Sequence, residues 1–123
     1  MKIALLGYGK MGKVIEKLAV ERGHKIVFKS NSNTQKIDLS NADIAIDFST
    51  PKSAVHNIST CINYNIPVIS GTTGWLEKYD QITNLCNEKK GAFIYSSNFS
   101  LGVNIFFELN KHLAKIMSNL KQY

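Results

Sequence analysis

"MKIALLGYGKMGKVIEKLAV" (residues 1–20) opens the chain and decides its fold. Residues 2–6 form a short apolar run that is typical of a buried strand. The segment Gly-Tyr-Gly-Lys-Met-Gly follows at residues 7–12, and residues 11–22 then repeat apolar side chains at helical spacing. The expected apolar face of this helix consists of Val14, Ile15, Leu18 and Ala19. Gly23 is expected to end the helix. A strand, a glycine-rich turn and a helix in this order predict the first unit of a parallel α/β sheet.

The rest of the chain continues the alternation of strands and helices. Further strands are expected at residues 25–29, 43–48, 67–70 and 92–95, and further helices at residues 51–64 and 75–89. Thr50 and Pro51 supply an N-cap and a proline at the first helical position. Residues 30–41 are polar and lack a helical period, so a loop is expected there. Because alternating elements require crossover connections, we predict a Rossmann-like, doubly wound parallel sheet with helices on both faces.

The last segment has a different character, because a wide apolar stripe runs along a helix close to the end of the sequence. The stripe consists of Ile105, Phe106, Leu109, Leu113, Ile116, Met117 and Leu120. A stripe of this kind needs a partner surface. The remaining sequence offers none, so we expect self-association or a mobile helix in this chain.

Length and composition limit the class of protein. The chain has 123 residues, 44% of them hydrophobic, which is enough for one core and too few for two domains of ordinary size. No apolar run approaches the roughly 18 residues that a membrane span needs. Met1 leads directly into the first strand rather than into a signal peptide. We therefore expect a soluble, cytoplasmic protein with no membrane partner.

The charged and metal-binding residue types form no recognisable site. The net charge is +6, but the lysines are spread along the chain and Arg22 is the only arginine, which disfavours nucleic acid as a partner. Cys61 and Cys86 form no C-x-x-C pair, so free buried thiols are expected and a metal is not. The single histidines are interpreted as surface or helix-capping residues rather than catalysts: His24, His56 and His112.

The glycine-rich segment predicts dinucleotide binding. In G-x-G-x-x-G the first glycine permits a tight turn, the second lets a pyrophosphate approach the backbone, and the third lets the helix pack closely on the sheet. The helix N-terminus then presents free N–H groups and a positive dipole end to the phosphates. A turn that merely connects strand and helix is the alternative interpretation.

The end of the second strand bears on which dinucleotide is bound. No acid occurs between Arg22 and Asp38, where an Asp or Glu commonly binds the adenosine ribose. Lys29, Ser30 and Asn31 stand there instead, and a cation beside a hydroxyl and an amide suits a 2′-phosphate. We therefore favour NADPH, or a site that takes either NADPH or NADH. The alternative interpretation is that Lys29 is a solvated residue at the edge of the sheet.

Three more polar clusters follow the later strands. They are Asp47-Phe48-Ser49-Thr50, Gly71-Thr72-Thr73-Gly74 and Ser96-Ser97-Asn98-Phe99. The carboxyl ends of parallel strands share one edge of a sheet, and ligands bind at that edge. The clusters together predict one extended site for a long ligand.

Four motifs carry a resemblance to a known family. "GYGKMG", "AIDFSTP", "SGTTGW" and "SSNFSLGVN", in this order and at this spacing, resemble the amino-terminal domain of the 4-hydroxy-tetrahydrodipicolinate reductases of lysine and diaminopimelate biosynthesis. The resemblance covers essentially the whole chain. It implies reduction of a small cyclic substrate with a hydride from NADH or NADPH, by homotetramers with two domains in each subunit.

The resemblance also assigns roles to individual residues. It implies that the cofactor contacts are Gly7, Tyr8, Gly9, Lys10, Met11 and Gly12 at the pyrophosphate, Phe48, Ser49 and Thr50 along the ribose and nicotinamide path, Gly71, Thr72 and Thr73 around the nicotinamide ribose and carboxamide, and Ser96, Ser97, Asn98 and Phe99 at the nicotinamide end. Lys29 and Ser30 replace the acid that many relatives have on the second strand, so this sequence departs from the family there.

A second departure concerns the chemistry. Family members continue to a segment H-H-x-x-K-x-D-A-P-S-G-T that supplies the proton donor and the substrate contacts, and this sequence lacks it. We expect residues 1–101 to be the dinucleotide-binding domain and residues 102–123 to be the hinge and first helix of an absent substrate and tetramerisation domain. No catalytic residue is then expected within the chain, and the substrate would bind only to the full-length enzyme.

Other classes of protein remain as alternatives. A stand-alone nucleotide- or CoA-binding module would explain the short length without any catalytic residue. A basic nucleic-acid-binding domain and a different dehydrogenase with an equivalent cofactor domain are also compatible with the fold alone.

Overall fold

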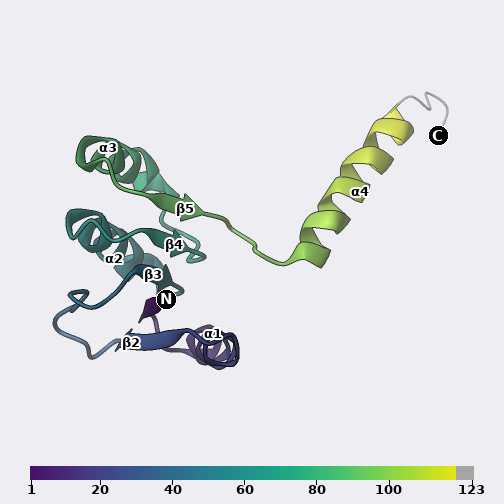
Figure 1. Cartoon of the computed structure of the whole chain (residues 1–123). Helices are drawn as coiled ribbons and strands as arrows, with labels where there is room; N and C mark the ends of the chain where they lie inside the picture. Colours follow the sequence, from purple (N-terminus) through teal and green to yellow (C-terminus); the bar gives the residue numbers. More distant parts are fainter. Residues whose placement is uncertain (119–123) are drawn as a thin grey trace.

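The computed structural model describes residues 1–118 and contains a five-stranded parallel sheet with helices (Figure 1). The strands are β1 (Lys2–Leu6), β2 (Lys25–Ser30), β3 (Ile44–Asp47), β4 (Val68–Ser70) and β5 (Phe93–Tyr95). The helices are α1 (Lys10–Glu21), α2 (Pro51–Asn63), the short 3-10 helix η1 (Leu76–Lys78), α3 (Tyr79–Lys89) and α4 (Leu101–Ser118). The predicted order of elements is therefore confirmed.

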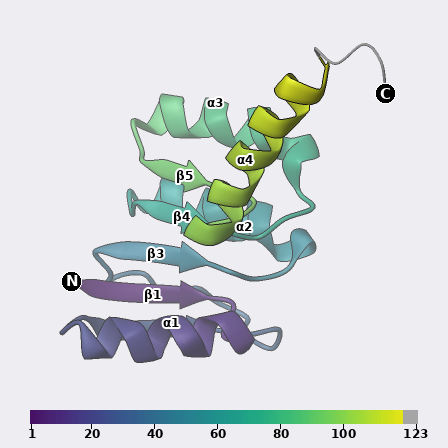
Figure 2. The same cartoon turned by 90° about the vertical axis from the view of Figure 1, so that its right-hand side faces the viewer.

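The sheet has the strand order β2-β1-β3-β4-β5. In Figure 2 the arrowheads of β1, β3, β4 and β5 point the same way, so their carboxyl ends lie along one edge. The chain order reverses between β1 and β3, which is the position where open parallel sheets form a crevice for ligands.

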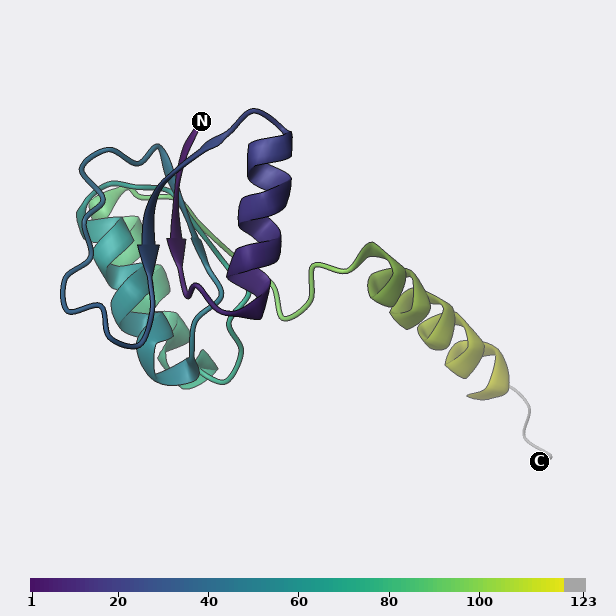
Figure 3. The ribbon, with the colours of Figure 1, turned by 90° about the horizontal axis from the view of Figure 1, so that it is seen from below.

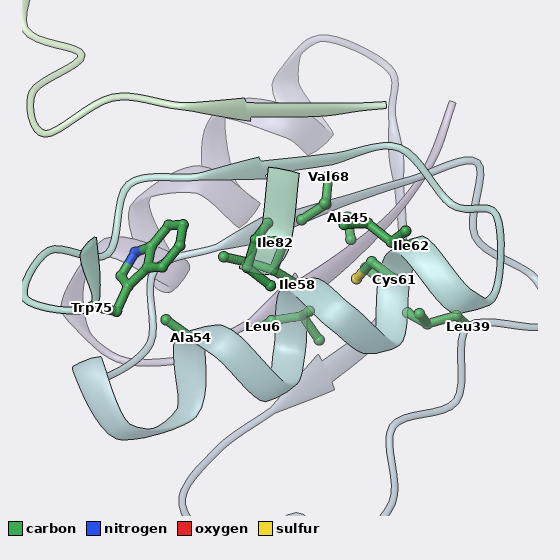
Figure 4. Close-up of a cluster of buried hydrophobic side chains, with 11 residues drawn as sticks. Leu6, Leu39, Ala45, Ala54, Ile58, Cys61, Ile62, Val68, Trp75 and Ile82 are labelled. Atoms are coloured by element: carbon green, nitrogen blue, oxygen red, sulfur yellow. The ribbon is translucent and has the colours of Figure 1, made fainter. Parts of the chain in front are cut away.

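Helices cover both faces of the sheet, which confirms the doubly wound architecture. Figure 3 shows α1 on one side of the strands and α2 on the other. The larger core lies on the side of α2 and α3, where Leu6, Ile58 and Trp75 are among the buried residues (Figure 4). The smaller core contains Ile3 and Leu5 from β1 and Ala19 from α1.

The first helix leaves part of its predicted apolar face exposed. Ala19 is buried and Ile15 packs against the smaller core, but Val14 is 49% exposed and Leu18 is 46% exposed. These two residues of the predicted apolar face therefore remain largely in solvent. Helical periodicity identifies residues that share a face, but it does not say how far the sheet extends beneath that face.

The predicted helix ends are largely confirmed. Gly23 has φ +76 and follows the last turn of α1, as expected for a helix stop. Thr50 is the N-cap residue of α2 with Pro51 at the first position, but the Thr50 side chain makes no capping bond and contacts Ser53 Oγ at 3.1 Å instead. No helix occurs between β2 and β3, in agreement with the predicted loop.

The last helix stands apart from the sheet. Figures 1 and 3 show α4 joined to β5 by an extended segment and projecting away from the sheet and its helices. None of its described residues is buried, and its stripe is exposed at Ile105, Phe106, Leu109, Leu113, Ile116 and Met117. Leu120, the last predicted member of the stripe, lies outside the described residues.

Candidate functional site

The glycine turn after β1 lies against the end of β3, where the strand order reverses. Gly7 has φ +97, and a Cβ on it would lie 2.2 Å from the carbonyl oxygen of Phe48. A Cβ on Gly12 would lie 2.4 Å from the carbonyl oxygen of Gly7. These two positions therefore need glycine for the close approach of the turn to the neighbouring loop and to the helix.

Gly9 differs from the other two glycines, because a Cβ on it would meet nothing within 4 Å. It is the N-cap residue of α1, and no side chain caps this helix end. The first turn of α1 also carries no acidic residue. An open space in front of uncapped N–H groups at the positive end of a helix dipole is suited to an anionic group.

Ser30, at the end of β2, holds the glycine turn in place. The amide of Gly7 donates to the Ser30 hydroxyl and to its carbonyl oxygen, each at 3.2 Å, and the amide of Tyr8 donates to the same carbonyl at 2.7 Å. Ser30 is itself buried. The observed hydrogen bonds of Ser30 are therefore made to the glycine turn.

Lys29 is paired with an acid that comes from another element. Its Nζ lies 2.5 Å from Oε1 of Glu16 on α1 and 4.6 Å from the centre of the Tyr8 ring. The Tyr8 hydroxyl donates to Glu16 as well. The bond to Lys29 lowers the pKa of Glu16, and the bond to Glu16 raises the pKa of Lys29. Glu16 thus pairs with Lys29 and does not line the larger cleft.

The larger cleft, of about 600 Å³, opens at the strand reversal. It is lined by Gly7, Tyr8 and Gly9, by residues of the loop after β2 and by the first turns of α2. Lys29 is not among the lining residues. The lining also includes residues without a predicted role at this site: Ser32, Thr34, Gln35, Lys52, Ser53, His56 and Asn57. The spacing of Lys52 and His56 on a helix that starts at this edge is the signal that could have found those two.

A second cleft, of about 280 Å³, continues from the first along the same edge. It is lined by Met11, Phe48, Ser49, Pro51, Gly71, Thr72 and Thr73, and it shares Phe48 and Ser49 with the larger cleft. A Cβ on Gly71 would lie 2.2 Å from the Phe48 ring, so this ring rests on the glycine. Thr73 is exposed at the rim. Most of the residues predicted at the ends of β1, β3 and β4 are thus brought together.

Asp47, the last residue of β3, is completely buried beneath this second cleft. Its Oδ1 accepts hydrogen bonds from Ser49 Oγ at 2.7 Å and Asn57 Nδ2 at 2.9 Å. Its Oδ2 accepts from Ser70 Oγ at 2.9 Å and Thr72 Oγ1 at 2.7 Å. In the sequence Asp47 belongs to a polar cluster without an assigned role, and Asn57 stands in no motif. Both lie where three elements meet, a position that no local pattern reveals.

The polar residues after β5 form hydrogen bonds with one another and with the start of α4. Ser96 Oγ donates to the carbonyl oxygen of Asn98, and Asn98 Oδ1 accepts from the amide of Ser100 at 2.7 Å. Asn104 Nδ2 also donates to the Asn98 carbonyl. Phe99 is half exposed, and its ring centre lies 6.4 Å from that of Phe48. Phe99 is therefore the member of this cluster that stands nearest to the second cleft in the contacts observed, while Ser97 is exposed.

The remaining reactive side chains form no further centre within residues 1–118. No group of three or more His, Cys, Asp or Glu residues is positioned to hold a metal ion in this part of the chain. Cys61 and Cys86 are free, Cys61 being buried, and burial raises the pKa of its thiol to about 12. None of the helices described between residues 1 and 118 is long and apolar enough to cross a membrane.

The sheet order and the glycine turn define a Rossmann-like α/β domain of the class found in NAD(P)-dependent dehydrogenases. A hyperthermophilic archaeal homoserine dehydrogenase solved in complex with NADPH shares this fold, with a TM-score of 0.59 and 15% identity over 78% of this chain and 43% of the dehydrogenase chain. The family model "Dihydrodipicolinate reductase, N-terminus" matches residues 1–99, and the chain belongs to this family.

Individual relatives agree with the family assignment. The 4-hydroxy-tetrahydrodipicolinate reductase of Christiangramia forsetii is 54% identical over 125 aligned residues, which cover 100% of this chain and 52% of that protein. The reductase of the same name from Thermosipho africanus is 33% identical over 120 residues, which cover 97% of this chain and 54% of that protein. The chain therefore spans about half the length of the curated relatives it matches. The resemblance expected from four motifs is confirmed.

Proposed function

We propose that this chain is the cofactor-binding half of a 4-hydroxy-tetrahydrodipicolinate reductase and that it binds NADPH or NADH. The observation that carries the proposal is the open space over Gly9, in front of the uncapped N-terminus of α1 and inside the larger cleft. A pyrophosphate fits this cradle, because it needs N–H donors, a positive dipole end and a backbone without a side chain in the way.

The positions of the two clefts suggest which end of the bound dinucleotide lies in each. The adenosine half would occupy the larger cleft between the loop after β2 and the start of α2, and the nicotinamide half would extend past Phe48 toward Gly71 and Thr73. Lys10 at the start of α1 adds a positive charge near the phosphates. When bound, the reduced nicotinamide supplies a hydride, and the chain's own residues bind and orient it.

The choice between NADPH and NADH rests on the adenosine end. Lys52 and His56 line the larger cleft, and no acidic residue does so within the part of the chain that the structure describes. This charge balance favours a 2′-phosphate. Lys29 would contribute from behind Tyr8, although its charge is shared with Glu16.

Further properties are proposed for the longer protein by analogy with the named relatives. Hydride transfer leaves negative charge on the substrate, which a proton donor must neutralise. We assign that donor and the substrate contacts to residues outside this chain. Residues 102–123 would then lead into a substrate and tetramerisation domain, with the exposed apolar face of α4 packed against it. A homotetramer in the cytoplasm is the corresponding whole enzyme.

Calorimetric titration of this chain with NADPH, NADH and coenzyme A tests the proposal. We expect binding of at least one nicotinamide dinucleotide and none of coenzyme A. Binding of coenzyme A alone would favour the stand-alone CoA module instead. Absence of binding for both dinucleotides at millimolar concentration would reject the proposed site.

A further inference from the structure

The buried carboxylate of Asp47 ties together the two loops that border the second cleft. Ser49 belongs to the loop after β3, and Thr72 belongs to the loop after β4. Both donate their hydroxyl hydrogens to Asp47, and the amide of Ser49 donates to Thr72 Oγ1 at 2.8 Å. A backbone hydrogen bond adds to this connection, from the amide of Gly71 to the carbonyl oxygen of Asp47 at 2.9 Å.

A carboxylate is the side chain that this arrangement requires. Asp47 accepts four hydrogen bonds, two at each oxygen. An asparagine offers a single acceptor oxygen and adds two N–H donors, so it cannot accept from all four partners. Neither ion pair within residues 1–118 involves Asp47, so these four donors are what stabilises its buried charge.

The network decides which groups remain for a ligand. The Ser49 hydroxyl donates to Asp47 and accepts from Asn57 Nδ2 at 3.1 Å. The Thr72 hydroxyl donates to Asp47 and accepts from Ser49, and the Thr72 carbonyl accepts from Trp75 Nε1 at 2.6 Å. Both residues are thus engaged internally. Their internal bonds fix their neighbours in the chain. These neighbours are Phe48, whose ring lies against Gly71, and Thr73, which is exposed at the rim of the second cleft.

We propose that Asp47 is a positioning residue for the nicotinamide half of the dinucleotide site. It joins the loop at residues 71–73, which lines the second cleft alone, to the loop at residues 48–50, which lines both clefts. The glycine turn at residues 7–12 packs against the Phe48 backbone but makes its hydrogen bonds to Ser30. The inference rests on the proposed function, because it assigns the second cleft to the nicotinamide half. Its consequence is that Asp47 affects the two halves of the cofactor unequally.

A comparison of the whole dinucleotide with its adenosine fragment tests whether Asp47 affects the two halves unequally. The Asp47→Asn variant of this chain is titrated with NADPH and with 2′,5′-ADP, which carries the adenosine half and a phosphate of the pyrophosphate but no nicotinamide. If the wild-type chain prefers NADH, then NADH and 5′-ADP replace them. We expect about a tenfold loss of affinity for the whole dinucleotide and less than about a threefold loss for the adenosine fragment, as fits loss of hydrogen bonds to a charged group.

A second variant covers the case in which Asp47→Asn does not fold. Thr72→Val keeps the shape of the side chain and removes the hydroxyl that joins Asp47 to the amide of Ser49. Thr83→Val is the matched control, because the Thr83 hydroxyl bonds only to the Tyr79 carbonyl on α3 in the contacts observed. We expect Thr72→Val to repeat the unequal loss, Thr83→Val to show none, and Thr72→Ser to restore most of the affinity.

The emission of Trp75, read together with far-ultraviolet circular dichroism, distinguishes local release of the loop from unfolding of the chain. Trp75 is the only tryptophan of the chain, it is 3% exposed, and its indole bonds to the loop that Asp47 holds. Release of the loop would shift its emission to longer wavelength while the far-ultraviolet circular dichroism stays unchanged. Equal losses for both ligands, or no loss for either, in folded Asp47→Asn and Thr72→Val would overturn the positioning role alone. A wild-type chain that binds neither dinucleotide nor fragment would overturn the proposed function, and this inference with it.

Discussion

Lys29 on β2 and Glu16 on α1 form an ion pair with 2.5 Å between Nζ and Oε1, and the Tyr8 ring lies beneath the ammonium group. This pair connects the glycine turn, the first helix and the edge strand β2 at the adenosine end of the proposed site. We therefore expect it to affect cofactor preference.

Replacing Lys29 with alanine is expected to weaken NADPH more than NADH. The 2′-phosphate, which NADH lacks, loses a positive charge nearby, so we expect about a fivefold loss for NADPH and less than about twofold for NADH. Calorimetric titration measures both. Lys25→Ala, at the exposed opposite end of the same strand, is the control and should change neither. Equal losses for the two cofactors would show that Lys29 does not act on the 2′-phosphate.

The same ion pair predicts how stability depends on pH. Because the bond to Lys29 lowers the pKa of Glu16 in the folded chain, the stabilisation is present above the ordinary glutamate pKa and is lost as the pH falls through the lowered value. The raised pKa of Lys29 places the alkaline loss above the ordinary lysine pKa. Thermal unfolding of wild type and Glu16→Gln should therefore differ near neutral pH and converge in acid. Glu108→Gln, at the exposed pair on α4, should show little difference at any pH.

Substitutions at two glycines of the turn should have different effects, one on cofactor binding and the other on stability. Gly9→Ala meets open space and should leave the melting temperature nearly unchanged, while NADPH affinity falls by about tenfold or more because the methyl group occupies the phosphate cradle. Gly7→Ala combines φ +97 with a contact at 2.2 Å and should destabilise the fold by about 2 kcal/mol or more. Gly102→Ala, also in open space but on α4, is the control for the first change. Full affinity in Gly9→Ala would place the phosphates elsewhere.

The two thiols should differ in reactivity. Burial, with a smaller effect from the charge of Asp47, raises the pKa of Cys61 to about 12, whereas Cys86 is only partly buried. Since the thiolate is the reactive form, a thiol reagent at mildly alkaline pH should label Cys86 first and Cys61 only after unfolding. Mass spectrometry of labelled peptides identifies the site. Rapid labelling of Cys61 in the folded chain would contradict its burial.

The exposed apolar face of α4 should make this chain self-associate at high concentration. Ile105 and Leu109 are adjacent on this exposed face, and contiguous exposed apolar surface promotes association. Sedimentation of wild type should depend on concentration, and Leu109→Glu should suppress that dependence. Lys111→Glu, on the opposite side of the helix, should not. A wild-type chain that stays monomeric throughout the range would contradict the expectation.

Much of the architecture could be predicted from local sequence because each element carries its own signal. Residues 2–6 and 43–48 are predicted as strands, and the structure has strands at Lys2–Leu6 and Ile44–Asp47. Gly23 follows the first helix, and no helix forms in the polar segment 30–41, both as predicted. The convergence of the loops after β1, β3 and β4 also followed, since parallel strands place their carboxyl ends on one edge.

Other features depend on contacts between distant elements and could not be predicted locally. The pairing of Lys29 with Glu16 joins a strand to a helix, and Asp47 gathers donors from two loops and from α2. The exposure of Val14 and Leu18 depends on what covers α1 rather than on the period of its sequence. The glycine pattern predicts that a phosphate cradle exists, but not which neighbouring polar groups are used to hold it.

The attachment of α4 through a single extended segment has a mechanical consequence. The helix contains 18 residues, so its axis extends about 27 Å from its first turn. A rotation of only about 10° where it begins, at Leu101, displaces its far end by about 5 Å. A small rotation at Leu101 therefore moves the far end of α4 by several ångströms. This rotation point lies a few residues from Phe99, beside the end of the cleft where we place the nicotinamide.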